Sequence, residues 1–346
     1  MDVPKRHHII LLIIFSLLIS SGVSGQERGL LLSKYYSPKD YKQGVQNWSV
    51  TQDKRGVMYF GNANGVMEYD GVNWRLIKVA NNSAARCLSV NENNVLFVGA
   101  FGELGCLLPN KKGELLYNSL IPLLDNEHVD FGEIWDINCF SDSVFFLSDK
   151  YLFLYHNNKF DYWESKKERF YLTYNVNNNL YVQEIGKGLL KFENGSLNLI
   201  EKGEFFTDIR IHSIFPLEEK LLICTRSDGF FIYEKKGSNV TITSLSEISG
   251  QTKKINEYFI KHSFYHGVKI HNNQLALASI TDNIIVVDQN WNVTDVIDSK
   301  SIGIKGSSFY LYYRENQSLW LALDNGVCHV DILSPFRYWN EETGIH

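Results

Sequence analysis

Three carboxylates near the middle of the chain are the first candidates for chemistry. Asp130, Glu133 and Asp136 follow one another closely in the sequence. A glycosidase needs a pair of such groups at a defined separation, one of them a proton donor. Side chains alternate along a strand, so Glu133 and Asp136 would face opposite sides of a sheet. The spacing does not specify the carboxyl separation that hydrolysis needs, and we expect no catalytic residue.

Motifs for a metal ion, a nucleotide or an acyl-enzyme are missing from the sequence. His262 and His266 are four residues apart in a segment that reads as extended, where they would lie about 13 Å apart and could not share an ion alone. Gly186-Lys187-Gly188 lacks the rest of a phosphate-binding loop, and there is no Gly-x-Ser-x-Gly elbow. We therefore expect neither a metal ion nor a cofactor.

Aromatic residues beside acidic ones point to binding instead. Two connections combine the two types, Phe101-Gly102-Glu103 and Asp130-Phe131-Gly132-Glu133, and Trp135 follows the second. Rings near loop edges can line the mouth of a site for a sugar or a peptide. The residues expected to bind a ligand are Phe101, Glu103, Asp130, Glu133 and Trp135. The expected partner is an oligosaccharide or another small ligand.

The elements that position these residues are strands. The 346 residues are 44% hydrophobic and include 19 Tyr and 21 Phe, a composition typical of strands, and helical periodicity is hard to find after the first 25 residues. The net charge of −5 gives no basic footprint for nucleic acid over the whole chain. We expect an all-β protein that does not bind nucleic acid.

One pattern recurs along the whole chain: a short apolar strand, a tight turn, a second apolar strand and a polar turn. The first copy is Val57–Gly61 followed by Val66–Tyr69, and the seven copies begin at residues 57, 95, 144, 180, 221, 275 and 319. The mean step of about 44 residues is the size of a four-stranded propeller blade. A strand before and a strand after each copy complete four antiparallel strands.

These repeats predict a seven-bladed β-propeller over residues 26–346, with four antiparallel strands in each blade. Asn-rich turns between the strands favour positive φ angles or cap themselves. A stack of β-sandwiches would not need one hairpin repeated seven times, but it stays as the alternative. The expected blades are near residues 47–80, 86–122, 133–163, 170–201, 211–247, 264–298 and 307–340.

The N-terminus has the pattern of a cleaved signal peptide. A basic head, Lys5 to His8, precedes an apolar run from Ile9 to Ile19, and small residues lead up to Gly25. This run is too short to span a bilayer, which needs roughly 20 residues. We expect cleavage after residue 25, export to the periplasm and no membrane span in the chain.

Five cysteines remain in the mature chain, at positions 87, 106, 139, 224 and 328. Their number is odd, no Cys-x-x-Cys occurs, and several lie in apolar strand-like runs. Most are expected to be buried small hydrophobic residues, and any disulfide pairing stays open.

The first repeat, Trp48–Trp74, resembles the two-component regulator propeller repeat. Its segment Asp53-Lys54-Arg55-Gly56-Val57-Met58-Tyr59-Phe60-Gly61 and the following Gly65-Val66-Met67-Glu68-Tyr69-Asp70-Gly71 follow that family's pattern. Asn62 stands where the family usually has Ser or Thr. Residues 318–327 are similar to a shorter copy, 335–339 resemble the strand that ends such a repeat, and 35–41 resemble the family's lead-in. The middle repeats follow the pattern only.

The resemblance implies an exported, ligand-sensing propeller of a Bacteroidetes-type signal-transduction regulator, without catalysis of its own. In that family further sensor domains and a kinase or DNA-binding output commonly follow the propeller. The chain ends after 341–345, which resemble the start of another repeat. We therefore expect either a truncated sensor or its N-terminal propeller, whose partners would be downstream sensor domains or a second propeller. A glycan hydrolase or lyase and a structural adhesion propeller remain alternatives.

Overall fold

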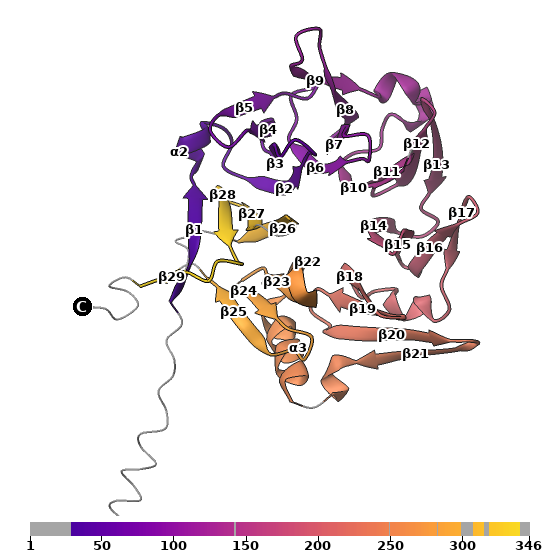
Figure 1. Ribbon diagram of the computed structural model, residues 1–346. Coiled ribbons are helices and arrows are strands. Elements are labelled where there is room, and N and C mark those ends of the chain that lie inside the picture. The colour runs from indigo at the N-terminus through magenta and orange to yellow at the C-terminus, as the bar shows by residue number, and fades with distance from the viewer. Residues whose placement is uncertain are drawn as a thin grey trace, which may run out of the picture. The chain divides into compact units, whose positions relative to one another are not determined.

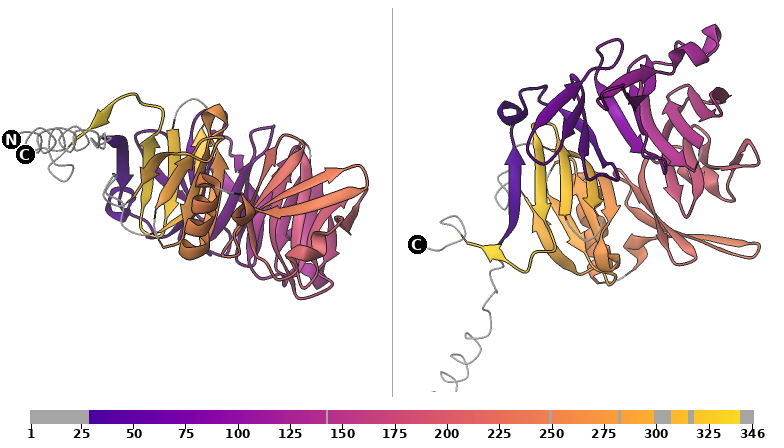
Figure 2. Two further views of the ribbon diagram at one scale, coloured as in Figure 1. Left: turned by 90° about the horizontal axis from the view of Figure 1, so that it is seen from below. Right: turned by 45° about the horizontal axis from the view of Figure 1, so that its top comes forward.

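The computed structural model describes residues 29–141, 143–248, 250–281, 283–298, 307–314 and 318–339. The expected signal peptide and the segment 341–345 lie outside these residues. Residues 31–334 form one compact unit, in which seven antiparallel sheets stand around a central axis (Figure 1). Figure 2 shows the same structure from the edge of the ring and in a tilted view. The fold is a seven-bladed β-propeller, as the repeats predicted.

Blades 1 to 6 each consist of four strands that are consecutive in the chain. Blades 1 to 3 comprise β2 (Asn47–Gln52), β3 (Met58–Asn62), β4 (Gly65–Tyr69), β5 (Trp74–Ile77); β6 (Ala85–Val90), β7 (Leu96–Ala100), β8 (Glu103–Pro109), β9 (Leu115–Ser119); and β10 (Ile134–Phe140), β11 (Ser143–Ser148), β12 (Tyr151–His156), β13 (Lys159–Glu164). Blades 4 to 6 comprise β14 (Arg169–Val176), β15 (Asn179–Ile185), β16 (Gly188–Glu193), β17 (Ser196–Leu199); β18 (Ile211–Leu217), β19 (Lys220–Thr225), β20 (Phe230–Lys236), β21 (Asn239–Ser244); and β22 (Phe264–Lys269), β23 (Leu275–Ser279), β24 (Ile284–Val287), β25 (Val293–Ile297).

Blade 7 is completed by the N-terminal strand. Its strands are β26 (Ser308–Arg314), β27 (Ser318–Leu323) and β28 (Val327–Asp331), and β1 (Leu30–Tyr36) pairs antiparallel with β28, from Leu32 opposite Asp331 to Tyr36 opposite Val327. The sequence suggested residues 335–339 for this outer strand. The short strand β29 (Arg337–Tyr338) does form there, but residues 335–339 belong with 29–30 to a separate small unit. The ring closes because this sheet combines the first strand of the propeller, β1, with its last three strands, β26 to β28.

The turns follow from local chemistry. Asn177 and Asn178, between β14 and β15, have φ angles of 49° and 61°, and Asn194-Gly195 between β16 and β17 has 51° and 73°. Two successive positive φ angles match the twist of the flanking strands in a two-residue hairpin. Asn and Gly adopt such angles most readily, which confirms the sequence-based prediction for these turns.

The core is divided into seven apolar clusters, one at each contact between neighbouring blades. Phe146 and Phe153 of blade 3, for example, are fully buried against Phe97 and Cys106 of blade 2. Each sheet therefore hides both of its faces against adjacent sheets, and the ring has no single central core.

Short helical segments connect several blades. The segments between blades are α2 (Pro38–Tyr41), α3 (Gln251–His262) and the 3-10 turns η1 (Ile121–Leu123), η2 (Asn126–His128), η3 (Gly203–Phe206) and η4 (Leu245–Glu247). A further 3-10 turn, η5 (His271–Asn273), lies between β22 and β23 within blade 6. Helix α3 forms although helical periodicity is hard to find in the sequence after residue 25: it inserts between blades 5 and 6 and buries Ile255 and Phe259. His262 ends this helix, so the segment from His262 to His266 is not one extended strand as expected.

Asn256 secures helix α3 to blade 5. Its side-chain oxygen accepts a hydrogen bond from the backbone N–H of Phe230 at 2.7 Å, and its amide group donates to Ser246 Oγ at 2.6 Å. Gly229 makes this approach feasible, because a Cβ there would lie 2.9 Å from the Asn256 oxygen, and its φ of 88° suits only glycine well. Among the described residues, no helix has the length and apolar character needed to cross a membrane.

Candidate functional site

The innermost strands of the seven blades surround a channel with a cavity of about 1030 Å³. Every blade contains four alternating strands, so the innermost strands all run in the same direction and begin at the same face. We call the opening at this face the arginine mouth. It is lined by residues at or next to the starts of the innermost strands and by Arg226 in the turn between β19 and β20. The set is Trp48, Arg86, Trp135, Arg169, Tyr171, Arg210, His212, Arg226 and Tyr265.

Arg86 of blade 2 lies between two indole rings. Its guanidinium carbon is 4.2 Å from the ring centre of Trp48 and 5.1 Å from that of Trp135. Two hydrogen bonds of 3.1 and 3.2 Å join the same guanidinium to both oxygens of Glu133. Planar contacts of this kind hold an arginine in one orientation. Arg86 and Glu133 therefore fix two tryptophans from blades 1 and 3 as a rigid aromatic platform, and Trp135 stays 37% exposed.

Tyr171 and His212 connect blades 4 and 5 across the arginine mouth. The phenol oxygen of Tyr171 lies 2.9 Å from His212 Nε2, and His212 Nδ1 lies 2.7 Å from the backbone carbonyl of Tyr265. A carbonyl oxygen only accepts, so Nδ1 carries the proton and Nε2 accepts from Tyr171. Burial lowers the pKa of His212 to about 4, with smaller contributions from the nearby charges of Arg226 and Arg210. The imidazole is thus neutral near pH 7.

Three more arginines gather beside this pair. The Arg169 guanidinium lies 5.3 Å from the Tyr171 ring centre and 2.9 Å from the Asp149 carboxylate, while Arg210 lies 5.9 Å from the same ring. Arg226 follows β19, where its backbone N–H donates to the Arg210 carbonyl at 2.8 Å. Burial raises the pKa of Tyr171, and the charges of Arg210, Arg226 and Arg169 oppose that rise. The three arginines therefore lie around the same part of the cavity, beside Tyr171.

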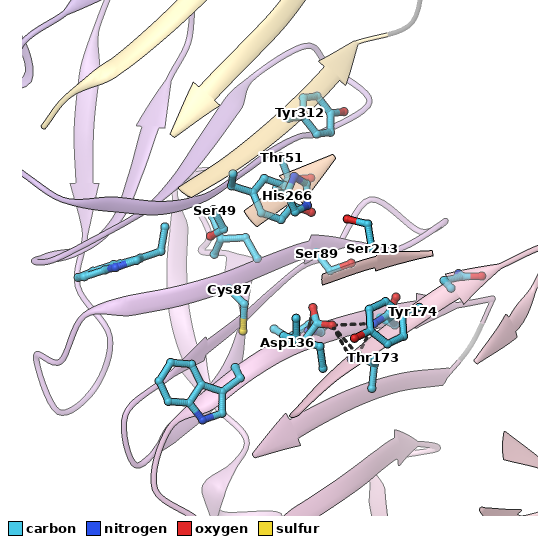
Figure 3. A pocket seen from close by; sticks show the side chains of 18 of the residues that line it. Ser49, Thr51, Cys87, Ser89, Asp136, Thr173, Tyr174, Ser213, His266 and Tyr312 are labelled. Carbon is cyan, nitrogen blue, oxygen red and sulfur yellow. Dashed lines mark hydrogen bonds between the residues drawn. The ribbon is translucent and has the colours of Figure 1, made fainter. Parts of the chain in front are cut away.

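Deeper in the channel, polar side chains such as Asp136, Thr173 and His266 stand among apolar ones in the lining (Figure 3). Asp136 accepts hydrogen bonds from Thr173 Oγ1 at 2.6 Å and from the backbone N–H of Ile137 at 2.9 Å. Burial raises the pKa of Asp136, although the bonds from Thr173 oppose the rise. His266 stacks on Tyr310 with ring centres 4.1 Å apart, and burial lowers its pKa to about 3.

Carboxylates do not converge in this channel. Within the described part of the chain, Asp136 and Glu92 are the acidic residues that line it. Asp136 belongs to the start of an innermost strand, whereas Glu92 follows the end of one, β6, at the opposite face. The same part of the chain holds no group of three His, Cys, Asp or Glu side chains arranged to bind a metal ion.

The structure places the five expected ligand-binding residues in different settings. Glu133 and Trp135 meet at the arginine mouth through Arg86. Phe101 is 60% exposed in the β7–β8 turn and forms a backbone bridge with Glu133. Glu103 is buried instead, where its carboxylate accepts from Tyr117 at 3.0 Å and from Ser119 at 2.6 Å on the outer strand β9. Asp130 is exposed and, like Glu103, is not part of the channel lining.

Sequence reasoning missed the arginines, Tyr171 and His212. A signal was present: Trp48, Arg86, Trp135, Tyr171 and His212 all occur within the first three residues of an innermost strand. Aligning the strand starts of the seven repeats would have collected these residues at one face. The motif search grouped residues close in sequence, whereas the ring groups residues at equivalent positions of successive repeats.

No protein-family model matches the sequence, and no curated protein matches it. Solved structures that are similar include the extracellular domain of a protein described as a hybrid two-component system, BT4673, from B. thetaiotaomicron, with 16% identity, a TM-score of 0.64, and coverage of 88% of this chain and 40% of that chain. Virginiamycin B lyase from Staphylococcus aureus has 11% identity, a TM-score of 0.63, and coverage of 88% and 99%. The WD40 propeller domain of Doa1 has 12% identity, a TM-score of 0.63, and coverage of 91% and 100%. These similarities show the fold, which serves several functions.

Proposed function

We propose that this chain is the exported, ligand-sensing propeller of a signal-transduction regulator, with the arginine mouth as its binding site and no reaction of its own. The observation that carries the proposal is the convergence of aromatic and cationic side chains from blades 1 to 6 on one opening of the channel. Rigid rings beside hydrogen-bond donors, around a cavity of about 1030 Å³, are the usual ingredients of a site for a small ligand.

Two further observations support sensing over catalysis. Of the two carboxylates that line the channel, Asp136 lies near the start of an innermost strand and Glu92 follows the end of another, at the opposite face. They therefore do not form the pair that glycoside hydrolysis uses. The extracellular domain of the hybrid two-component system BT4673 also shares the fold. An exported location agrees with the signal-peptide pattern of residues 1–25.

A lyase is the second candidate, and the Tyr171–His212 pair is the observation that favours it. A neutral imidazole that accepts a hydrogen bond from a phenol is placed to relay protons, and the neighbouring arginines could stabilise a developing negative charge. Virginiamycin B lyase shares the fold. The two candidates differ in one result, namely whether the bound ligand is chemically changed.

Isothermal titration calorimetry with a panel of neutral and acidic oligosaccharides tests the proposal. We expect binding of one ligand per chain, at least ten-fold weaker in Trp135→Ala and unchanged in Tyr162→Ala, an exposed aromatic on the outer strand β13. Mass spectrometry should recover the ligand unaltered after prolonged incubation. Binding that does not depend on Trp135 would contradict the proposed site. If wild type instead converts the ligand to a product that Tyr171→Phe and His212→Asn do not form, the protein is a lyase.

A further inference from the structure

We infer that the arginine mouth recognises an acidic saccharide, a sugar ring bearing a carboxylate or a sulfate. The inference rests on the proposed function and adds the chemical class of its ligand. It follows from how the charges of the arginine mouth are paired and from where the aromatic platform lies.

Charge at the arginine mouth is only partly compensated. Arg86 is paired with Glu133 and Arg169 with Asp149. Among the residues that the structure describes, no carboxylate forms an ion pair with Arg210 or Arg226. The whole chain has a net charge of −5, so this opening has the opposite sign to the molecule as a whole. Two uncompensated guanidinium groups at one opening attract an anion and can bind it with paired hydrogen bonds.

The backbone holds the two uncompensated arginines together. The N–H of Arg226 donates to the carbonyl of Arg210 at 2.8 Å, and the carbonyl of Arg226 accepts from the N–H of Phe264 at 2.7 Å. Both cations lower the pKa of His212, which places their charges near the same imidazole. Because Arg210 is exposed and Arg226 is half-buried, an anion from solvent can reach them.

His212 stays neutral and therefore does not add a third positive charge to the pair. Its Nδ1 proton is directed to the Tyr265 carbonyl, and its Nε2 is occupied by Tyr171. Neither nitrogen of the imidazole is left for a ligand. The anion subsite is consequently formed by Arg210 and Arg226, and His212 serves to position Tyr171 beside them.

Aromatic rings next to the cations indicate that the anion is carried on a larger ring-shaped molecule. Trp48 and Trp135 flank Arg86, and Tyr171 lies beside Arg169 and Arg210. The cavity of about 1030 Å³ is far larger than an inorganic anion requires and lies at the upper end of ligand pockets. A sugar ring stacks its C–H face on an indole while its acidic group reaches the guanidinium groups.

Two matched pairs of probes test the inference by titration calorimetry of the exported chain. The carboxylate pair is trigalacturonic acid and its trimethyl ester, and the sulfate pair is neocarratetraose disulfate and its desulfated form. We expect at least one acidic probe to bind, at least ten-fold tighter than its neutral counterpart, and to weaken as ionic strength rises. Its affinity should fall at least ten-fold in Arg210→Gln/Arg226→Gln.

A charge-matched control is Lys111→Gln/Lys112→Gln in the exposed β8–β9 turn, which should change affinity less than two-fold. The inference is overturned if neither acidic probe binds, if the neutral counterparts bind equally well, or if the arginine double variant binds as the wild type does. It is also overturned if inorganic sulfate binds as tightly as the acidic sugars. Neutral sugars that bind and are lost in Trp135→Ala would remove the acidic class and leave the proposed function standing.

Discussion

Acidification should destabilise the propeller, because His212 is held in its neutral form. His212 is only 9% exposed, and burial lowers the pKa of its imidazole from 6.5 to about 4. The unfolded chain takes up a proton at this imidazole near pH 6.5, whereas the folded chain does so only near pH 4. Between these values the unfolded state binds more protons, so stability falls as the pH falls.

The size of this effect follows from the two pKa values. Going from pH 7 to pH 5, proton uptake by the unfolded imidazole lowers the free energy of unfolding by about 2 kcal/mol. The folded state contributes almost nothing in this range, so the result depends little on how far below pH 5 its titration lies. His266, with its pKa lowered to about 3, adds a similar loss that persists in a His212 variant.

Urea unfolding of wild type and His212→Asn at pH 7 and pH 5 measures the effect. The asparagine amide can still donate to the Tyr265 carbonyl but cannot titrate, so the variant should lose about 2 kcal/mol less than wild type between the two pH values. Tyr171→Phe is the matched control, because it removes the hydrogen bond to Nε2 and keeps the imidazole. An equal loss in His212→Asn and wild type would refute the assignment of a buried neutral histidine.

Three other perturbations address packing and closure. Phe146→Ala empties a fully buried site between blades 2 and 3 and should cost about 3–5 kcal/mol in urea unfolding; a loss below 1 kcal/mol would contradict the packing. Asn47→Ala removes the 2.8 Å hydrogen bond to the Gly326 carbonyl, which joins blades 1 and 7, and should cost about 1–3 kcal/mol, read as a lower Tm; an unchanged Tm would exclude this role. Burial raises the pKa of Cys87 and Cys224, so a thiol reagent at pH 8 should react with them only after unfolding, and rapid reaction of the native chain would show otherwise.

Part of the candidate site was predictable from short-range patterns. Trp135 and Glu133 were found because aromatic and acidic residues stood together on a connection. Glu103 had the same local pattern, yet its carboxylate turns to Tyr117 and Ser119 within its own blade. Local composition does not tell which side of a sheet a residue faces relative to the channel, because that depends on register with the neighbouring strands.

Helix α3 shows a similar limit. Its buried residues Thr252, Ile255, Asn256 and Phe259 have helical spacing, but two of the four are polar. Among its apolar residues, Ile255, Tyr258 and Phe259 do have helical spacing, but they span little more than one turn, which is too short a pattern to identify a helix. Asn256 is buried because it satisfies a backbone N–H and a hydroxyl group across the interface with blade 5, contacts that only the folded structure supplies.

The sequence by itself determined the number of blades, the strands and the turns, because hairpins and Asn-rich turns depend on residues that are neighbours in the chain. Tertiary structure decided two things that neighbours cannot encode. It chose β1 instead of residues 335–339 to pair with β28, and it brought Trp48, Arg86, Tyr171 and Arg226 to one opening. Both require closure of a ring, which places residues side by side although they are separated by whole repeats.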